Sequence, residues 1–401
     1  MSGRKPGSIA DDLRGLSRLA VDATRGITDL VEAVHHNIVS NPGKAASREH
    51  GRTAGISAMA YRSVHGITQV FGSGIDTALA ILAPYLGNIP DRPEREHVQS
   101  ALNGLLGDHL SASENPLAIP MRLRRNGLAL ELDARALSMS IPEVTGKIVV
   151  LVHGLCMNDR QWSRPRGDGV IHDHGIALQN ECGYTAVYLH YNTGLAISDN
   201  GLQFAGLLET LLAQWPVPPE ELVIVAHSMG GLVSRSALHQ ARQLGMSWSG
   251  KLGRIIFLGT PHHGAPLERG GHWLDLVIGA MPYAAPFAKI GRIRSAGVTG
   301  LRHGHLLENQ HGPIPLPEGI RCYAIAGLVG EQDAILRAKY LGDGLVPLDS
   351  ALGRHHDASR HLDFPDDRQV VLAVTNHMQL LSDAGAYQAI KRFTGGTALP
   401  V

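Results

Sequence analysis

The stretch that most constrains the fold of this chain runs from Glu221 to Leu232 and reads ELVIVAHSMGGL. It begins with a short apolar run, rich in β-branched residues, that has the length of a buried strand. A serine between small residues follows, and apolar residues then recur at helical spacing. A strand that turns directly into a helix needs small side chains around the turn, and Ala226, Gly230 and Gly231 provide them. The pattern is typical of a nucleophile elbow with Ser228 exposed at its tip.

The elbow interpretation rests on sequence context more than on the five residues around the serine. A small-x-Ser-x-Gly spacing can arise by chance in a chain with 47 glycines, but Ser228 alone among the serines has it. A glycine-rich turn without any chemical role is the alternative. In an elbow, the Met229 amide begins the helix and points into the same space as the Ser228 hydroxyl, so it can help to hold an oxyanion.

Composition excludes several classes of protein. The 401 residues, 44% of them hydrophobic, are enough for one large α/β domain and an extension. Lys plus Arg and Asp plus Glu both number 36, so no nucleic-acid partner is expected. Three cysteines are too few and too scattered for a disulfide framework or a zinc site. No secretory signal or membrane-spanning segment is recognisable, and a cytoplasmic protein is therefore expected.

The first 115 residues are predicted to form a helical N-terminal extension. Apolar residues recur at steps of three and four over residues 11–40, over residues 56–82 and again from His97 to Leu110. Each helix has one apolar stripe that must be covered. Packing on the rest of the protein, peripheral contact with a membrane or lipid surface, and self-association all remain open, and the oligomeric state is undetermined.

From residue 116 to 401 the pattern changes to that of an α/β domain with a mostly parallel central sheet flanked by helices. Asn126-Gly127 predicts a tight hairpin turn. Strands and helices then alternate, which implies right-handed crossovers. The strands are expected at Lys147–Val152, Thr185–Tyr191, Leu222–Ala226, Arg254–Leu258, Arg321–Ala326 and Gln369–Val374. Residues 267–317, rich in Gly, Pro and His, predict a lid-like insertion that helps to set substrate specificity.

A serine nucleophile needs a histidine to take its proton and a carboxylate to orient that histidine. In elbow-containing folds these groups follow the serine in the order acid, then histidine, on loops at the carboxyl ends of the strands. Among 22 histidines, position favours His377, which lies between the last strand and the last helix. For the acid, Asp343 lies between two glycines in the loop that precedes that strand. Asp349 is the second candidate.

The remaining site residues are expected beside the strand that ends at Val152. In the segment His153-Gly154-Leu155, Gly154 allows the backbone to approach a substrate, so the Leu155 amide can be the second oxyanion donor beside that of Met229. His153 lies on the wrong element for a general base and is expected to line the wall of the site. The predicted substrate-binding residues are His153, Gly154 and His227.

These motifs carry a family resemblance over residues 147–393. VHGL, AHSMGG, LGTPHHGAP and GDGLVP, in this order, are similar to the oxyanion strand, elbow, post-elbow loop and acid loop of the α/β-hydrolase superfamily. Within it the chain resembles bacterial triacylglycerol lipases, esterases and related lipid deacylases. Ala226 departs from the commoner glycine. No equivalent of the calcium-binding carboxylates of some lipases is recognisable, so neither a metal nor another cofactor is expected.

The resemblance implies hydrolysis of carboxylic esters with an apolar acyl part, through an acyl-enzyme at Ser228. An acyltransferase, a thioesterase or a polyester depolymerase would use the same three residues. A non-catalytic binding or scaffold protein on a hydrolase fold is the alternative of a different class. Such a binding protein would not need Ser228, Asp343 and His377 in this order, so an enzyme with an ester or lipid substrate is favoured. The acyl chain length of that substrate stays open.

Overall fold

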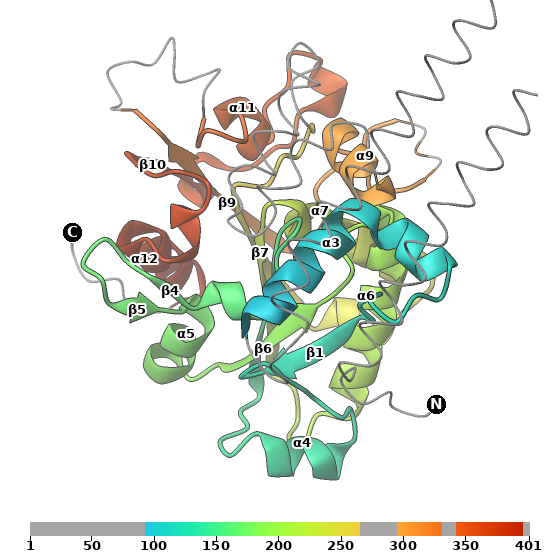
Figure 1. Cartoon of the computed structure of the whole chain (residues 1–401). Coiled ribbons are helices and arrows are strands. Elements are labelled where there is room, and N and C mark those ends of the chain that lie inside the picture. The colour runs from blue at the N-terminus through green and yellow to red at the C-terminus, as the bar shows by residue number, and fades with distance from the viewer. Residues whose placement is uncertain (1–92, 265–294, 309, 311, 331–341, 396–401) are drawn as a thin grey trace, which may run out of the picture.

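The computed structural model describes residues 93–264, 295–308, 310, 312–330 and 342–395 (Figure 1). Its centre is an eight-stranded sheet in the order β10-β9-β8-β7-β3-β6-β1-β2. The strands are β1 Arg122–Arg125, β2 Leu128–Ala129, β3 Lys147–Val152, β6 Thr185–His190, β7 Glu221–His227, β8 Leu252–Leu258, β9 Arg321–Leu328 and β10 Gln369–Ala373. A separate two-stranded hairpin consists of β4 Arg164–Pro165 and β5 Ile171–His172.

The helices are α3 Pro93–Ala112, α4 Ala134–Ser140, α5 His174–Cys182, α6 Ile197–Ala213, α7 Met229–Gln243, α9 Ala296–His303, α11 Leu348–Ala351 and α12 Ala384–Phe393. Short 3₁₀ helices are found at Asp159–Trp162, Ser247–Gly250, Ala358–Arg360, Asp366–Arg368 and Gln379–Leu381. The pair α6 and α7 lies on one side of the sheet, and the pair α5 and α12 lies on the other (Figure 1). No described helix combines the length and the apolar character needed to span a bilayer.

The pairing of the strands confirms the predicted α/β-hydrolase fold. The six strands from β10 to β6 are parallel to one another, whereas β1 is antiparallel to both β6 and β2. The hairpin between β1 and β2 turns at Asn126 and Gly127, whose φ angles of 50° and 74° are those of the predicted tight turn. Parallel strands covered on both faces must be apolar throughout, and residues 148–152 and 222–226 are completely buried.

The structure describes part of the two regions predicted from periodicity alone. The expected helix from His97 to Leu110 is α3, whereas the helices expected over residues 11–40 and 56–82 lie outside the described residues. Most of the insertion predicted at 267–317 also lies outside them, and its described part contains α9. Helix α4 was not predicted. It is preceded by Asp133, whose side chain accepts hydrogen bonds from the amides of Arg135 and Ala136.

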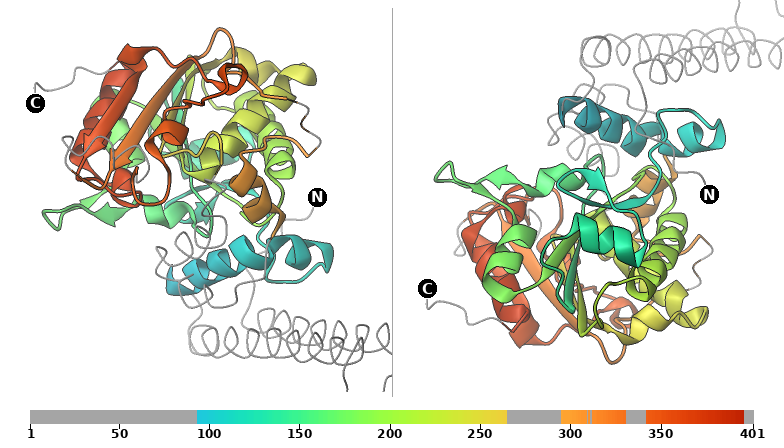
Figure 2. Two further views of the ribbon diagram at one scale, coloured as in Figure 1. Left: turned by 90° about the horizontal axis from the view of Figure 1, so that it is seen from above. Right: turned by 90° about the horizontal axis from the view of Figure 1, so that it is seen from below.

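Helix α3 crosses the carboxyl ends of β3 and β6, and both views of Figure 2 place it at the end of the domain away from α12. Two glycines allow this close approach. A Cβ atom on Gly104 would collide with the Cys156 side chain, and one on Gly107 would collide with Asn192. The Ser295 hydroxyl donates to the Gly104 carbonyl at 2.7 Å. The helix therefore covers the loops that follow two central strands.

A partly buried ionic network holds the start of α3 against the same region. Arg124 of β1 contacts Glu96 of α3 at 2.7 Å and Asp159 at 2.9 Å, and Arg160 contacts Glu96 at 2.7 Å. Burial alone would raise the pKa of Asp159, but the adjacent His190 ring and the charge of Arg124 lower it to about 2. The network connects α3, β1 and the short helix that follows the loop after β3.

Several histidines are buried in the domain without a charged partner. Burial lowers the pKa of His153 and that of His174 to about 3, so both rings are neutral at pH 7 in the folded protein. In the unfolded chain a histidine has a pKa of about 6.5. Below pH 6.5 the unfolded chain therefore binds more protons than the folded one, and stability is lost as the pH falls from 6.5 toward 3.

We predict that the free energy of unfolding falls between pH 6.5 and pH 5 by up to about 1.4 kcal/mol per pH unit for each buried neutral histidine. The variant His174→Gln removes one of these groups and should reduce that slope in urea titrations at several pH values. The exposed His361 provides the matched control, His361→Gln, which should leave the slope unchanged. A slope that is the same in wild type and His174→Gln would contradict the assignment.

Candidate active site

Ser228 lies between the end of β7 and the start of α7 in a strained backbone conformation. Its φ and ψ angles are 54° and −126°, a region that costs a non-glycine residue on the order of 1–3 kcal/mol. The side chains around it must be small. A Cβ atom on Gly230 would lie 2.5 Å from the Val152 carbonyl oxygen, and one on Gly231 would collide with the Thr260 hydroxyl. The turn is therefore held tightly between β3 and the loop after β8.

The structure brings Asp343 and His377 together. The Nδ1 atom of His377 lies 2.6 Å from Oδ2 of Asp343, and both residues are buried. Because a carboxylate only accepts, the ring donates through Nδ1, which leaves Nε2 for another partner. The second carboxylate oxygen accepts from the amides of Leu345 at 3.0 Å and Val346 at 2.8 Å. These bonds hold the carboxylate in one orientation.

The second acidic candidate occupies a different position. Asp349 lies in α11, while the carboxylate that contacts His377 belongs to Asp343.

A glycine at the end of β8 makes room for the pair. Gly259 has a φ of 55°, and a Cβ atom there would lie 2.9 Å from Oδ2 of Asp343 and 3.0 Å from Nδ1 of His377. Any larger residue would therefore press against both groups. The loops that follow β8, β9 and β10 thus converge at one point.

His227 connects this pair to the elbow. Its Nε2 atom lies 3.0 Å from the His377 carbonyl oxygen, so Nε2 is the donor, and the two rings are 4.5 Å apart. Burial lowers the pKa of His227 well below its usual value, with the neighbouring His377 adding to the effect, and the ring is neutral. His227 was expected to bind substrate. The structure shows it fully buried and in contact with the His377 backbone.

The loop after β3 lies directly against the elbow. A Cβ atom on Gly154 would be 2.9 Å from the Cβ atom of Ser228, so the absence of a side chain at this glycine lets the loop lie against the elbow. Leu155 follows in the same loop, with a completely buried side chain. The Met229 amide lies in the first turn of α7, where amides lack helical acceptors and the helix dipole favours negative charge.

His153 supports this loop from inside the domain. It is completely buried, its ring stacks on Tyr191 with centroids 4.5 Å apart, and the Tyr191 hydroxyl donates to the His153 carbonyl at 2.8 Å. Sequence reasoning did not identify Tyr191, because nothing local marks its partner 38 residues away. Cys156 in the same loop is no alternative nucleophile, since burial raises the pKa of its thiol to about 12.

Within the described ranges, no group of three or more His, Cys, Asp or Glu side chains is arranged to hold a metal ion. A family model described as a PGAP1-like alpha/beta domain matches residues 143–280, which include β3, the elbow and the loop after β8. No curated protein matches the chain.

Among solved structures, the chain is similar to the mature form of the lipase BlEst2 from Bacillus licheniformis, with 20% identity, a TM-score of 0.41 and coverage of 62% of this chain and 91% of that one. It is also similar to lipase B from Aspergillus fumigatus, with 16% identity, a TM-score of 0.37 and coverage of 93% and 83%. A third similar structure is an esterase from Pyrobaculum calidifontis, with 14% identity, a TM-score of 0.37 and coverage of 62% and 75%. Similarities at this level carry no information about the substrate.

The contact between Gly259 and the Asp343–His377 pair leads to a prediction. Gly259→Ala should separate the pair, and the low-field proton resonance expected for the Nδ1 proton of His377 should shift or disappear. Gly319→Ala is the matched control, because Gly319 also has a positive φ, 75°, but has open space around it. Both variants carry a backbone strain of about 1–2 kcal/mol. An unchanged resonance in Gly259→Ala would contradict the predicted collision.

Proposed function

We propose that this protein is a serine hydrolase that cleaves carboxylic esters with an apolar acyl part. The observation that carries the proposal is the buried pair of Asp343 and His377, 2.6 Å apart, joined to the elbow of Ser228 through His227. A purely structural pair would not need a serine held in a strained turn beside it.

In the proposed reaction Nε2 of His377 takes the proton of Ser228 while the serine oxygen forms a bond to the ester carbonyl carbon. Asp343 keeps the ring oriented and stabilises its positive charge. The amides of Met229 and Leu155 donate to the oxyanion, and loss of one such donor typically costs about 3 kcal/mol of transition-state stabilisation.

The tetrahedral intermediate collapses when the bond to the alcohol oxygen breaks, and His377 returns its proton to that oxygen. The acyl group remains on Ser228. A water molecule then gives a proton to His377 and attacks the acyl carbon, and the second collapse returns the proton to Ser228 and releases the carboxylic acid. Gly154 lies beside Ser228, and this supports a role for its loop in positioning the ester carbonyl.

The first test is covalent labelling. A fluorophosphonate probe should label the wild-type protein and should fail to label Ser228→Ala, because the probe reacts with an activated serine. Absence of label on the folded wild type would favour a non-catalytic protein. Label that persists in Ser228→Ala would place the nucleophile elsewhere.

The second test separates the two acidic candidates by their kinetics. Asp343→Asn and His377→Ala should each lower kcat on p-nitrophenyl esters by roughly 10³–10⁴-fold, because the base is misoriented or absent. Asp349→Asn is the matched control and should retain wild-type turnover. Near-normal activity in His377→Ala would contradict the assignment.

The same assay distinguishes the acyl acceptors. With an added alcohol, a hydrolase still converts most of the acyl group to the carboxylic acid, because water remains the main acceptor from the acyl-enzyme. An acyltransferase converts most of it to the new ester, so the ratio of acid to ester is measured.

A further inference from the structure

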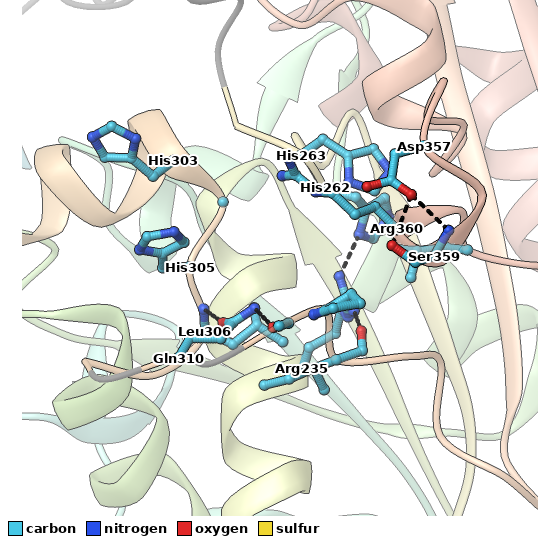
Figure 3. A pocket seen from close by; sticks show the side chains of 15 residues that line it. Arg235, His262, His263, His303, His305, Leu306, Gln310, Asp357, Ser359 and Arg360 are labelled. Carbon is cyan, nitrogen blue, oxygen red and sulfur yellow. Dashed lines mark hydrogen bonds between the residues drawn. The ribbon is translucent and has the colours of Figure 1, made fainter.

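A polar cavity of about 370 Å³ lies apart from the proposed catalytic residues (Figure 3). It lies between α7, the loop after β8, the end of α9 and the segment around residues 357–362. Arg235, which lines it, follows Ser228 by seven residues on α7, or about 10 Å along the helix axis. The close contact between Gly231 and Thr260 lies between the two sites. The cavity is therefore a separate site.

Arg235 is a buried cation without an anionic partner. It is 5% exposed, and its Nη2 atom donates to the Ile314 carbonyl at 2.5 Å. Its Nε atom has no acceptor, and no carboxylate of the described residues forms an ion pair with it. Burial lowers the pKa of Arg235 to about 10, and the group stays charged at pH 7. A buried charge of this kind normally has a counter-charge.

His262 lines the cavity and contacts Arg235 there. The Nη1 atom of Arg235 lies 3.3 Å from Nδ1 of His262, and because a guanidinium only donates, Nδ1 must accept. Burial lowers the pKa of His262 well below its usual value, with the charge of Arg235 adding to the effect, so the ring is neutral and carries its proton on Nε2. Among the described residues this Nε2 atom has no partner.

Arg360 is a second cation at the cavity and is exposed at its rim. Burial lowers the pKa of His263 to about 4, so that ring is neutral at pH 7. Figure 3 shows His303 and His305 on the wall opposite His262 and His263. Among the described lining residues the acidic side chain is Asp357, which accepts from the amide of Ser359 at 2.9 Å and from its hydroxyl at 2.7 Å, so it is directed to its own turn.

We propose that this cavity binds a phosphate group, either as free phosphate or as the phosphate of an anionic lipid headgroup. The side chain of Arg235 lines the cavity, and a phosphate oxygen can accept from a guanidinium N–H that Ile314 and His262 leave free, while Arg360 at the rim faces the remaining charge. A phosphate carries up to two negative charges, which two arginines balance, whereas a carboxylate carries one. The volume leaves room for an organic substituent on the phosphate.

Titration calorimetry of the full chain with inorganic phosphate, at constant ionic strength, tests the proposal. The wild type should bind phosphate saturably. Arg235→Met should weaken binding about tenfold or more, because a charge-assisted hydrogen bond inside a cavity is lost. Arg360→Ala and His262→Gln should each weaken it several-fold, and they provide the test if Arg235→Met does not fold. The control is Arg135→Ala, which removes an exposed arginine of α4 and should change nothing.

Two further probes separate the sources of the phosphate. The first probe is monomeric dihexanoylphosphatidylglycerol. A lipid headgroup is identified if this lipid binds, if phosphate competes with it, and if Arg235→Met weakens its binding. Binding of inorganic phosphate without that of the lipid identifies the free anion. The proposal is overturned if wild type binds neither, if acetate binds as tightly as phosphate, or if Arg360→Ala and His262→Gln both bind phosphate as wild type does.

Discussion

The site depends on one steric constraint, which is the close backbone packing around Ser228. The turn from β7 to α7 lies against the Val152 carbonyl and the Thr260 hydroxyl, and only the absence of side chains at Gly230 and Gly231 permits it. The strain in the Ser228 backbone persists because β3, β7 and β8 are completely buried where they lead into this region, at residues 148–152, 222–227 and 255–258, and close packing there prevents a shift that would relieve it. Gly154 and Gly259 extend the same constraint to the neighbouring loops.

The region around Ser228 also contains buried neutral histidines. His153 and His227 are buried beside the elbow, where they contact backbone carbonyls and another aromatic ring instead of a carboxylate. His377 differs from these two, because its ring contacts the carboxylate of Asp343. Burial therefore keeps His153 and His227 neutral, whereas His377 has an acidic partner.

Local patterns predicted much of the fold because they depend on neighbouring residues. The run Lys147–Val152 was predicted as a strand with the bounds that β3 has, since a strand buried on both faces is apolar throughout. The first turn of α6, which begins at Ile197, depends instead on tertiary contacts, because Asn200 donates to the Asn192 carbonyl at 3.0 Å and Gly201 packs on Ser236. The polar and small residues of this turn form no apolar period that would predict it.

The sequence by itself determined the order of strands and helices, the elbow at Ser228 and a short set of acidic and histidine candidates in loops. The tertiary structure decided which of these groups meet. Asp343 and His377 are 34 residues apart and come together because β9 and β10 are adjacent and parallel. The cavity beside Arg235 also has no local signal, since Arg235 and His262 are brought together by packing. Contacts of this kind depend on the order of strands in the sheet, which no single segment encodes.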